Sequence, residues 1–320
     1  MMIGFRKESK IKRENLMIEL QNVSKTYDYK KSVGFLKKEH VKVKAVEDIS
    51  FKVDEGEKIG LIGLNGAGKS TTIKMMTGIL ERDSGSISIN GHDPSKRERD
   101  LLNNIGVSMG QKSTLFFDIS PLDSFRYYKE VYRVSDSDFE DRMEKFSKIL
   151  KLEEILHTPV RKLSLGQKRR CEIVASLIHM PKVLFLDEPT LGLDVVTQVN
   201  IMDFLDEINR EFNITIILTT HEIKNIERFC KRIIILEKGK VIYDGDPNKF
   251  ADRNNFRKVR IPVEMMKEFP IEPDKIIFDR VEYVIDLNQL ETIDLSRFKF
   301  SEYTIEELSL EDVICMKYGN

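Results

Sequence analysis

The stretch Gly63-Leu-Asn-Gly-Ala-Gly68-Lys69-Ser70 decides the fold. It matches the pattern G-x-x-x-x-G-K-[ST] and follows the apolar run 57–62, which predicts a strand, a glycine loop and then a helix from about Lys69. Glycines let such a loop wrap until its N–H groups face phosphate oxygens, and the helix N-terminus adds positive potential. We therefore expect a nucleotide here, with Mg²⁺ bound by the Ser70 hydroxyl. The residues expected at the nucleotide are Gly63, Asn65, Gly66, Ala67, Gly68, Lys69, Ser70 and Thr71.

A second motif is the aliphatic run Val183-Leu-Phe-Leu that ends in Asp187-Glu188. An acid at the end of such a strand places a carboxylate beside the phosphates, where it can hold the metal. The next acid, Glu188, can polarise a water for attack on the γ-phosphate. An Asp-Glu-Pro sequence is also a common loop entry, but a glycine loop in the same chain favours the catalytic interpretation. The two motifs together predict ATP hydrolysis with Mg²⁺.

Composition limits the class of protein. The 320 residues contain 52 basic and 53 acidic side chains, and this net charge of -1 argues against a protein whose main partner is nucleic acid. The three cysteines are far apart without a CxxC pair, which favours reduced thiols over a disulfide framework or a zinc site. No apolar run approaches the roughly 18 residues of a membrane span. We expect a cytoplasmic or peripheral protein.

The distribution of charged and apolar residues along the chain predicts three regions. Residues 1–16 form a charged leader, and residues 17–251 alternate strands and helices, which predicts an α/β fold of the P-loop kind with a helical subdomain at about 112–165. Residues 252–320 are expected to form a small α+β domain. The lysine-rich segment 28–44 is interpreted as a solvated loop, with anionic lipid head groups as the alternative partner. Other predicted elements are strands at 49–53, 86–90, 183–186, 214–218, 232–236, 240–243, 257–261 and 280–287, and a helix near 306–316.

Four further motifs carry a resemblance to a known family. The stretch Leu163-Ser-Leu-Gly-Gln167 resembles the signature of ABC (ATP-binding cassette) ATPases, and Leu191-Gly-Leu-Asp194 resembles that family's D-loop. Thr219-Thr-His221 is similar to its switch histidine, and Gln111 to its Q-loop glutamine. With the two motifs above, these matches follow the family's order from residue 17 to about 250. The resemblance implies an ABC-type cassette, with a mixed sheet core and a helical subdomain.

The resemblance also implies a mechanism. Two cassettes stack head to tail around two ATP molecules, so that the P-loop of one faces the signature of the other. The second cassette is a copy of this chain or a homologue. The implied roles are catalysis for Glu188, His221 and Gln111, metal binding for Ser70, Gln111 and Asp187, and contact with ATP or the interface for Ser164, Gly166, Gln167 and Asp194.

The sequence departs from the family pattern in two places. Leu165 stands where the signature usually has glycine, although its backbone N–H remains available to phosphate. The aromatic residue that stacks on adenine is expected at Tyr27, which the lysine-rich segment places unusually far before Gly63. The alternative is a packed or solvent-facing tyrosine.

The finer classification rests on resemblance alone. The lysine-rich segment, the sequence around Gln111 and the signature resemble ATP-binding subunits of poorly characterised ABC-2-type exporters, a group that includes viologen exporters. ATPases for polysaccharide or teichoic-acid export are the nearest alternative, and a soluble ABC ATPase without a transport role is the other. We expect an integral membrane permease as partner, no nucleic acid, and a position on the cytoplasmic face of the membrane. The permease would select the substrate.

Two clusters beside these motifs have open interpretations. Phe116 and Phe117 follow Gln111 closely and could anchor a helix of the permease or pack into the helical subdomain. The cations Lys168, Arg169 and Arg170 follow the signature and could lie at the interface or in solvent.

Overall fold

The computed structural model describes residues 16–33, 37–110, 113–220, 223–295 and 303–318, and it divides into two units between Asp244 and Gly245. This division falls a few residues before the expected boundary at 251/252. The reason is the 3-10 segment η3 (Pro247–Asn255), which packs with α10 (Leu310–Tyr318) and β10 (Phe256–Pro262) of the second unit.

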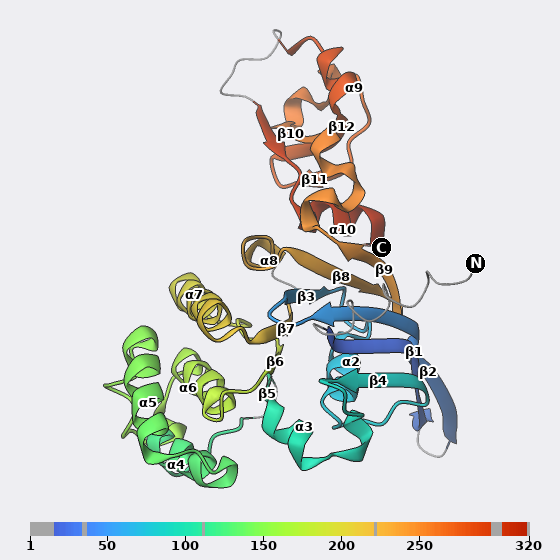
Figure 1. Ribbon diagram of the computed structural model, residues 1–320. Helices are drawn as coiled ribbons and strands as arrows, with labels where there is room; N and C mark the ends of the chain where they lie inside the picture. The colour runs from blue at the N-terminus through green and yellow to red at the C-terminus, as the bar shows by residue number, and fades with distance from the viewer. Residues whose placement is uncertain (1–15, 34–36, 111–112, 221–222, 296–302, 319–320) are drawn as a thin grey trace, which may run out of the picture. The chain divides into compact units, whose positions relative to one another are not determined.

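A six-stranded sheet organises the first unit (Figure 1). Its strands lie in the order β5-β6-β7-β3-β8-β9, and the first five pair in parallel. Most of these strands are continuous aliphatic runs, because both faces of the parallel sheet are buried. The carboxyl ends of β3, β6 and β7 therefore meet at one edge of the sheet. The bounds are β3 Lys58–Ile62, β5 Ile105–Met109, β6 Val183–Asp187, β7 Thr215–Thr219, β8 Arg232–Glu237 and β9 Lys240–Gly245.

Helices with polar N-caps connect these strands. Helix α2 (Lys69–Met76) follows the glycine loop, while α6 (Leu165–Leu177) and α7 (Val195–Phe212) are capped by Ser164 and Asp194. The helical subdomain contains α4 (Pro121–Tyr132) and α5 (Asp136–Leu150), each capped by a serine that accepts a backbone N–H at the third helical position. Shorter elements are η1 Pro94–Lys96, α3 Arg99–Asn104, η2 Val160–Lys162 and α8 Ile223–Phe229.

The predicted solvated loop at 28–44 is wrong. Strands β1 (Leu16–Val33) and β2 (Lys37–Asp54) continue as an antiparallel hairpin through this segment, and β4 (Ser84–Ile89) pairs with the first part of β1. The physical reason is a period of two: Tyr27 and Tyr29 alternate with polar residues on β1, as Val41 and Val43 do on β2. The lysines concealed this alternation.

The core of the first unit lies between the two sheets and α2. Ile18 and Phe51 from the antiparallel sheet, Ile73 from α2, and Phe185 and Ile234 from the parallel sheet belong to one buried cluster. This packing fixes α2, and with it the glycine loop, against the sheet.

The second unit is an antiparallel sheet in the order β11-β12-β10-β13, built on a core that includes Val259 and Tyr283. Its last helix, α10, begins at Leu310 rather than near 306 because Ser309 accepts the N–H of Asp312 and donates to its carboxylate. The residues before it form a strand that the sequence did not indicate. The remaining bounds are η4 Val263–Glu268, β11 Lys275–Ile277, β12 Arg280–Asp286, α9 Leu287–Glu291 and β13 Thr304–Glu307.

The described residues contain no candidate membrane span. No helix in that part of the chain combines the length and the apolar character that crossing a bilayer requires.

Candidate nucleotide-binding site

The glycine loop between β3 and α2 has the backbone of an anion cradle. Gly63 and Gly68 have φ angles of 154° and 107°, and a Cβ atom there would lie 2.3 Å from the carbonyl oxygen of Leu236 and 2.5 Å from that of Ala45. No other residue type fits at either position. The N-cap of α2 is Gly68, which provides no side-chain cap, and its first turn carries no acid. The N–H groups at the start of α2 therefore face a position suited to phosphate.

Lys69 lies in this loop and is only 6% exposed. Its ammonium donates to the carbonyl oxygens of Gly63 at 2.6 Å and Leu64 at 3.1 Å. Burial lowers the pKa of Lys69, and the nearby carboxylates of Glu188 and Asp187 oppose that shift. The ammonium is thus held over the loop where β- and γ-phosphates would lie.

The predicted metal ligands Ser70 and Asp187 are in contact. The Ser70 hydroxyl donates to Oδ1 of Asp187 at 3.0 Å, and the Thr219 hydroxyl donates to the same oxygen at 2.6 Å. A hydroxyl and a carboxylate are the hard oxygen ligands that Mg²⁺ takes alongside phosphate oxygens and water. The residues present therefore fit the ion. The contact of Thr219 with Asp187 was not predicted, because the sequence analysis noted Thr219 only as part of the motif that ends at His221.

Glu188 directly follows β6 and is half-buried. Its φ angle of 53° is unusual for a non-glycine residue, and its N–H donates to the carbonyl of Thr219 at 3.1 Å and to its hydroxyl at 3.0 Å. Two bonds to the neighbouring strand hold this sparsely populated conformation. The chain turns sharply after Asp187, so the two acids leave β6 in different directions.

Tyr27 lies beside the same loop. Its hydroxyl is 3.4 Å from that of Thr71 on α2, and the side chain is half-buried. The hairpin therefore keeps this aromatic residue next to the phosphate cradle despite the long separation in sequence.

The signature segment begins α6. Ser164 and Gln167 form a reciprocal capping box, in which the Ser164 N–H donates to Oε1 of Gln167 at 2.8 Å. Gly166 lies against Thr197 of α7, where an added Cβ would meet the threonine methyl at 3.4 Å. Leu165 is 55% exposed and its side chain reaches Gly192. The signature and the D-loop thus form one continuous surface.

That surface exposes a group of apolar side chains around Asp194. Asp194 caps α7 by accepting the N–H and the hydroxyl of Thr197 at 2.9 and 2.7 Å, and it is exposed. The hydrophobic side chains around it have exposed fractions between 42% and 72%. We call Leu165, Leu191, Val195 and Val196 the signature face.

Arg169 is neither interfacial nor solvent-exposed, contrary to both interpretations of the cations. It is 3% exposed, pairs with Glu172 at 3.1 Å, and donates to the carbonyl of Gly110 at 3.3 Å. Burial raises the pKa of Glu172, while Ser113 and Arg169 oppose that shift. Gly110 in turn donates to the carbonyl of Asp187 at 3.0 Å. The hydrogen bond from Arg169 to Gly110 therefore links the signature helix to the segment before Gln111, and Gly110 extends that link to β6.

A groove of about 560 Å³ lies between α3, α4 and α6. Its rim carries exposed apolar side chains from three segments, namely Ile79, Leu102 and Val131. His179 stacks on Tyr132 at its base, with ring centroids 3.8 Å apart. This groove could not be predicted from the sequence, because its lining residues come from segments that are far apart in the chain.

Phe116 and Phe117 lie near this groove, and they are neither fully exposed as permease anchors would be nor fully packed into the helical subdomain. Phe116 packs edge-on against Tyr127 with centroids 4.9 Å apart and remains 42% exposed, while Phe117 is 63% exposed. Neither ring is part of the core. The expected catalytic residues Gln111 and His221 lie outside the described residues.

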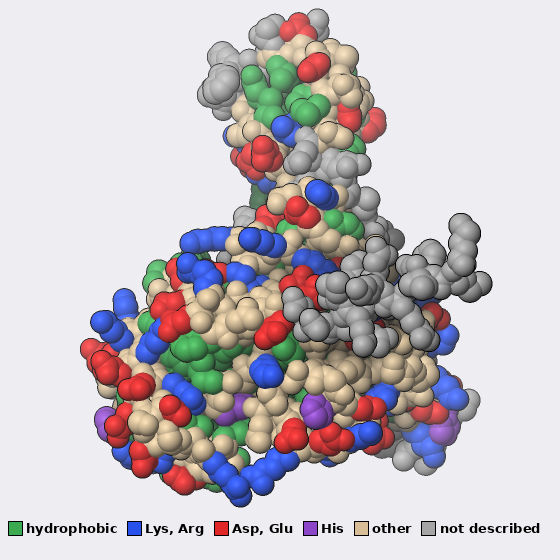
Figure 2. Space-filling view, in the orientation of Figure 1, with side chains coloured by type: hydrophobic (Ala, Val, Ile, Leu, Met, Phe, Trp, Pro, Cys, Tyr) green, Lys and Arg blue, Asp and Glu red, His purple; other side chains and the backbone are tan. Residues whose placement is uncertain are grey.

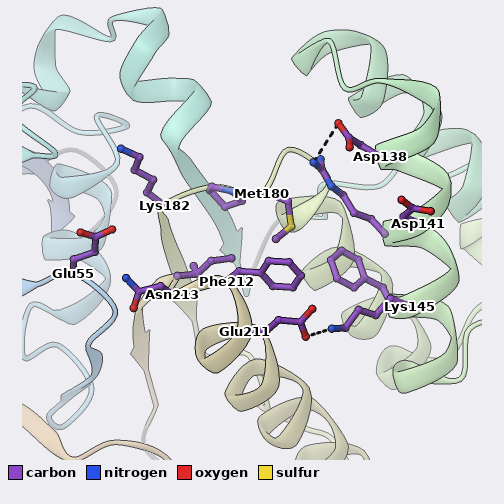
Figure 3. A pocket seen from close by; sticks show the side chains of 13 residues that line it. Glu55, Asp138, Asp141, Lys145, Met180, Lys182, Glu211, Phe212 and Asn213 are labelled. Carbon is purple, nitrogen blue, oxygen red and sulfur yellow. Dashed lines mark hydrogen bonds and ion pairs between the residues drawn. The ribbon is translucent and has the colours of Figure 1, made fainter.

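A cavity of about 610 Å³ lies elsewhere, between α5 and the end of α7 (Figure 3). Lys182 and Ile214 in its wall precede β6 and β7, so the cavity is at the opposite end of these strands from the nucleotide cradle. An ion pair between Lys145 and Glu211 crosses it. The residues expected at the nucleotide do not line it.

Known proteins share this arrangement. A family model described as ABC transporter matches residues 46–191. The chain is 31% identical over 229 residues to the ABC transporter ATP-binding protein NatA of Bacillus subtilis. The aligned segment covers 72% of this chain and 89% of NatA. The chain is 35% identical over 233 residues to the methionine import ATP-binding protein MetN 1 of Bacillus thuringiensis, covering 72% of this chain and 66% of that protein. A solved dimeric ATP-binding cassette in a post-hydrolysis state, bound to ADP and phosphate, is similar with a TM-score of 0.62 and 27% identity, covering 72% of this chain and 98% of that one.

Proposed function

Because this chain belongs to the ABC transporter family of ATP-binding proteins and is an ATPase, we propose that it drives a separate membrane permease in the export direction. The groove between α3, α4 and α6 is the observation that carries the permease proposal. It offers apolar side chains to solvent at Ile79, Leu102 and Val131, and no described helix could itself cross a membrane. An apolar rim of this kind suits a short helix of a membrane partner.

ATP binding in this proposal uses the glycine loop. Its N–H groups and Lys69 neutralise the β- and γ-phosphates, and Tyr27 stacks on the adenine. Mg²⁺, when bound, neutralises charge on the phosphate oxygens, with Ser70 and Asp187 as its protein ligands. Their contact at 3.0 Å supports this assignment, because one ion can bind both oxygens.

Hydrolysis in this proposal depends on Glu188. Its carboxylate accepts a proton from a water molecule as the water oxygen attacks the γ-phosphorus, and the bond to the β–γ bridging oxygen breaks. The products are ADP and inorganic phosphate. Gln111 and His221 complete the site around the water and the metal, as the family resemblance implies.

A second cassette completes each site. The N–H groups at the start of α6 in one copy face the γ-phosphate held by the other. The signature face supports this association, since Val195 and Val196 are 72% and 70% exposed beside Asp194. Such exposure of adjacent apolar residues is typical of an interface.

The export direction and the ABC-2-type class rest on the resemblance described above, and ATPases for polysaccharide or teichoic-acid export remain the alternative. Similarity to a methionine import protein favours import as a second candidate. Reconstitution with the permease in vesicles distinguishes them: ATP outside an inside-out vesicle should drive substrate inward for an exporter. Movement of substrate out of such vesicles would support import.

The permease proposal is tested by capture. The chain with Leu102→Asp and Val131→Asp should fold and hydrolyse ATP but lose co-purification with the permease from detergent, because charge in the groove opposes docking of an apolar helix. Ile276→Asp, at an exposed apolar residue of the second unit, is the matched control. Full capture by a stable groove variant would contradict the proposal.

A further inference from the structure

The β1–β2 hairpin extends beyond the sheet that supports it. Strand β4 pairs with β1 only as far as Ser24, and among the described residues β2 alone accompanies β1 from Thr26 to Val33. A two-stranded hairpin is marginally stable in water without a surface to cover it. This extension therefore calls for a partner surface.

The two faces of the extension differ in character. The register pairs Asp28 with Lys42 and Lys30 with His40, which places these side chains on one face together with Lys44. The lysines at 42 and 44 have side chains that are 74% and 67% exposed. The opposite face carries Tyr29 and Val43, which are 49% and 42% exposed. The extension is thus predominantly cationic on one face, whereas the other face carries these apolar side chains together with the exposed Glu39, which is opposite Lys31 in the strand register.

Positive charge is concentrated in the β1–β2 hairpin. The segment 28–44 contains six lysines against two acids, Asp28 and Glu39, although the whole chain has a net charge of -1. Asp28 already lies 3.3 Å from His40 and 3.9 Å from Lys42. Figure 2 shows basic side chains and a histidine, with acidic side chains among them, at the lower right, where the hairpin projects.

The hairpin also points to the side of the cassette that would face a membrane. In Figure 1 it extends toward the same lower edge of the view as α3 and α4, which border the groove proposed for the permease. A permease helix in that groove would bring the bilayer surface toward this side of the cassette.

We propose that the β1–β2 hairpin binds the surface of a bilayer that contains anionic phospholipids. This inference rests on the proposed function for its orientation. The lysines attract anionic head groups, and Tyr29 and Val43 suit the interfacial zone, where amphipathic side chains gather. Each lysine near an anionic leaflet strengthens binding roughly fivefold at moderate salt.

Sedimentation of the full chain with vesicles tests the proposal. The chain should bind vesicles of phosphatidylcholine mixed equally with phosphatidylglycerol, bind phosphatidylcholine alone far less, and lose binding as salt rises. Replacing Lys30, Lys42 and Lys44 with Gln should weaken binding roughly 100-fold. Replacing three exposed lysines elsewhere, Lys148, Lys231 and Lys238, removes the same charge and should change binding little.

Three outcomes would overturn the proposal: equal binding to both vesicle types, an equal loss in the two triple variants, or lysine-dependent binding of duplex DNA without binding of vesicles. ATPase activity reports folding of each variant. Permease capture is measured separately, so that a failure of vesicle binding with intact capture contradicts this inference and leaves the proposed function standing.

Discussion

The hydroxyl of Ser70 lies 3.0 Å from Oδ1 of Asp187, although the two residues are 117 positions apart in the chain. Ser70 lies in the first turn of α2 and Asp187 ends β6, so the contact depends on the parallel order of the strands between them. It places both predicted metal ligands at one point of the nucleotide cradle.

This contact predicts a specific defect in Mg²⁺ use. Ser70→Ala removes one oxygen ligand while leaving the loop intact, so the Mg²⁺ concentration that gives half-maximal ATPase activity should rise roughly 10-fold. Ser70→Thr keeps the hydroxyl and serves as the control. An unchanged Mg²⁺ titration for Ser70→Ala would remove this residue from the metal site.

The second prediction concerns ATP affinity. Lys69→Ala should weaken ATP binding roughly 10- to 100-fold, because the phosphates lose a charge-assisted hydrogen-bond donor. Titration calorimetry measures the effect. Lys74→Ala, on the same helix but at its other end, should bind ATP as the wild type does. Equal affinity of Lys69→Ala and the wild type would count against the nucleotide cradle.

The position of the cradle and of the acid pair could be predicted because glycine spacing and a buried aliphatic strand are local features. The contacts of Arg169 and the lining of the groove could not, since they bring together residues from separate segments. Lys168, Arg169 and Arg170 look alike in sequence. Only the packing of α6 against Gly110 buries Arg169, whereas Arg170 donates to the carbonyl oxygens of Leu150 and Lys151 at the C-terminal end of α5.

The lysine-rich segment was wrongly predicted although the pattern that specifies its strands is local. Six lysines between residues 28 and 44 suggested a loop, whereas the alternation of Tyr29, Val41 and Val43 was the feature that specified a strand pair. The cap at Ser309 similarly determined where α10 begins.

The third prediction concerns the buried ion pair. Arg169→Met leaves the Glu172 carboxylate buried without its cation and should lower the free energy of unfolding by about 3–5 kcal/mol. Adding Glu172→Met should recover most of that loss, since a buried pair is often replaceable by apolar side chains. Urea unfolding measures both.

A matched control exists on the surface. Arg126 pairs with Asp123 at 3.4 Å with both side chains more than half exposed, so Arg126→Met should cost less than about 1 kcal/mol. A similar small cost for Arg169→Met would show that Arg169 does not hold α6 against the segment at Gly110.

The fourth prediction is a pH dependence. Burial lowers the pKa of His179 from 6.5 to about 4. Because the unfolded chain takes up this proton first, stability is lost as pH falls from about 6.5 to about 4, by up to about 3 kcal/mol at 1.36 kcal/mol per pKa unit. His179→Gln should therefore lose less stability between pH 7 and pH 5 than the wild type, by about 2 kcal/mol. Identical losses in urea unfolding would contradict this assignment.

In the proposed mechanism ATP joins two copies through the cradle of one and the signature face of the other, and Glu188 activates the water. Size-exclusion chromatography with light scattering on Glu188→Gln tests it most directly. With ATP and Mg²⁺ the variant should elute as a dimer and hydrolyse ATP at least about 100-fold more slowly than the wild type, because the water loses its base. With ADP it should stay monomeric. A monomer in the presence of ATP would rule out the ATP-bound dimer, and turnover near the wild-type rate would rule out Glu188 as the base.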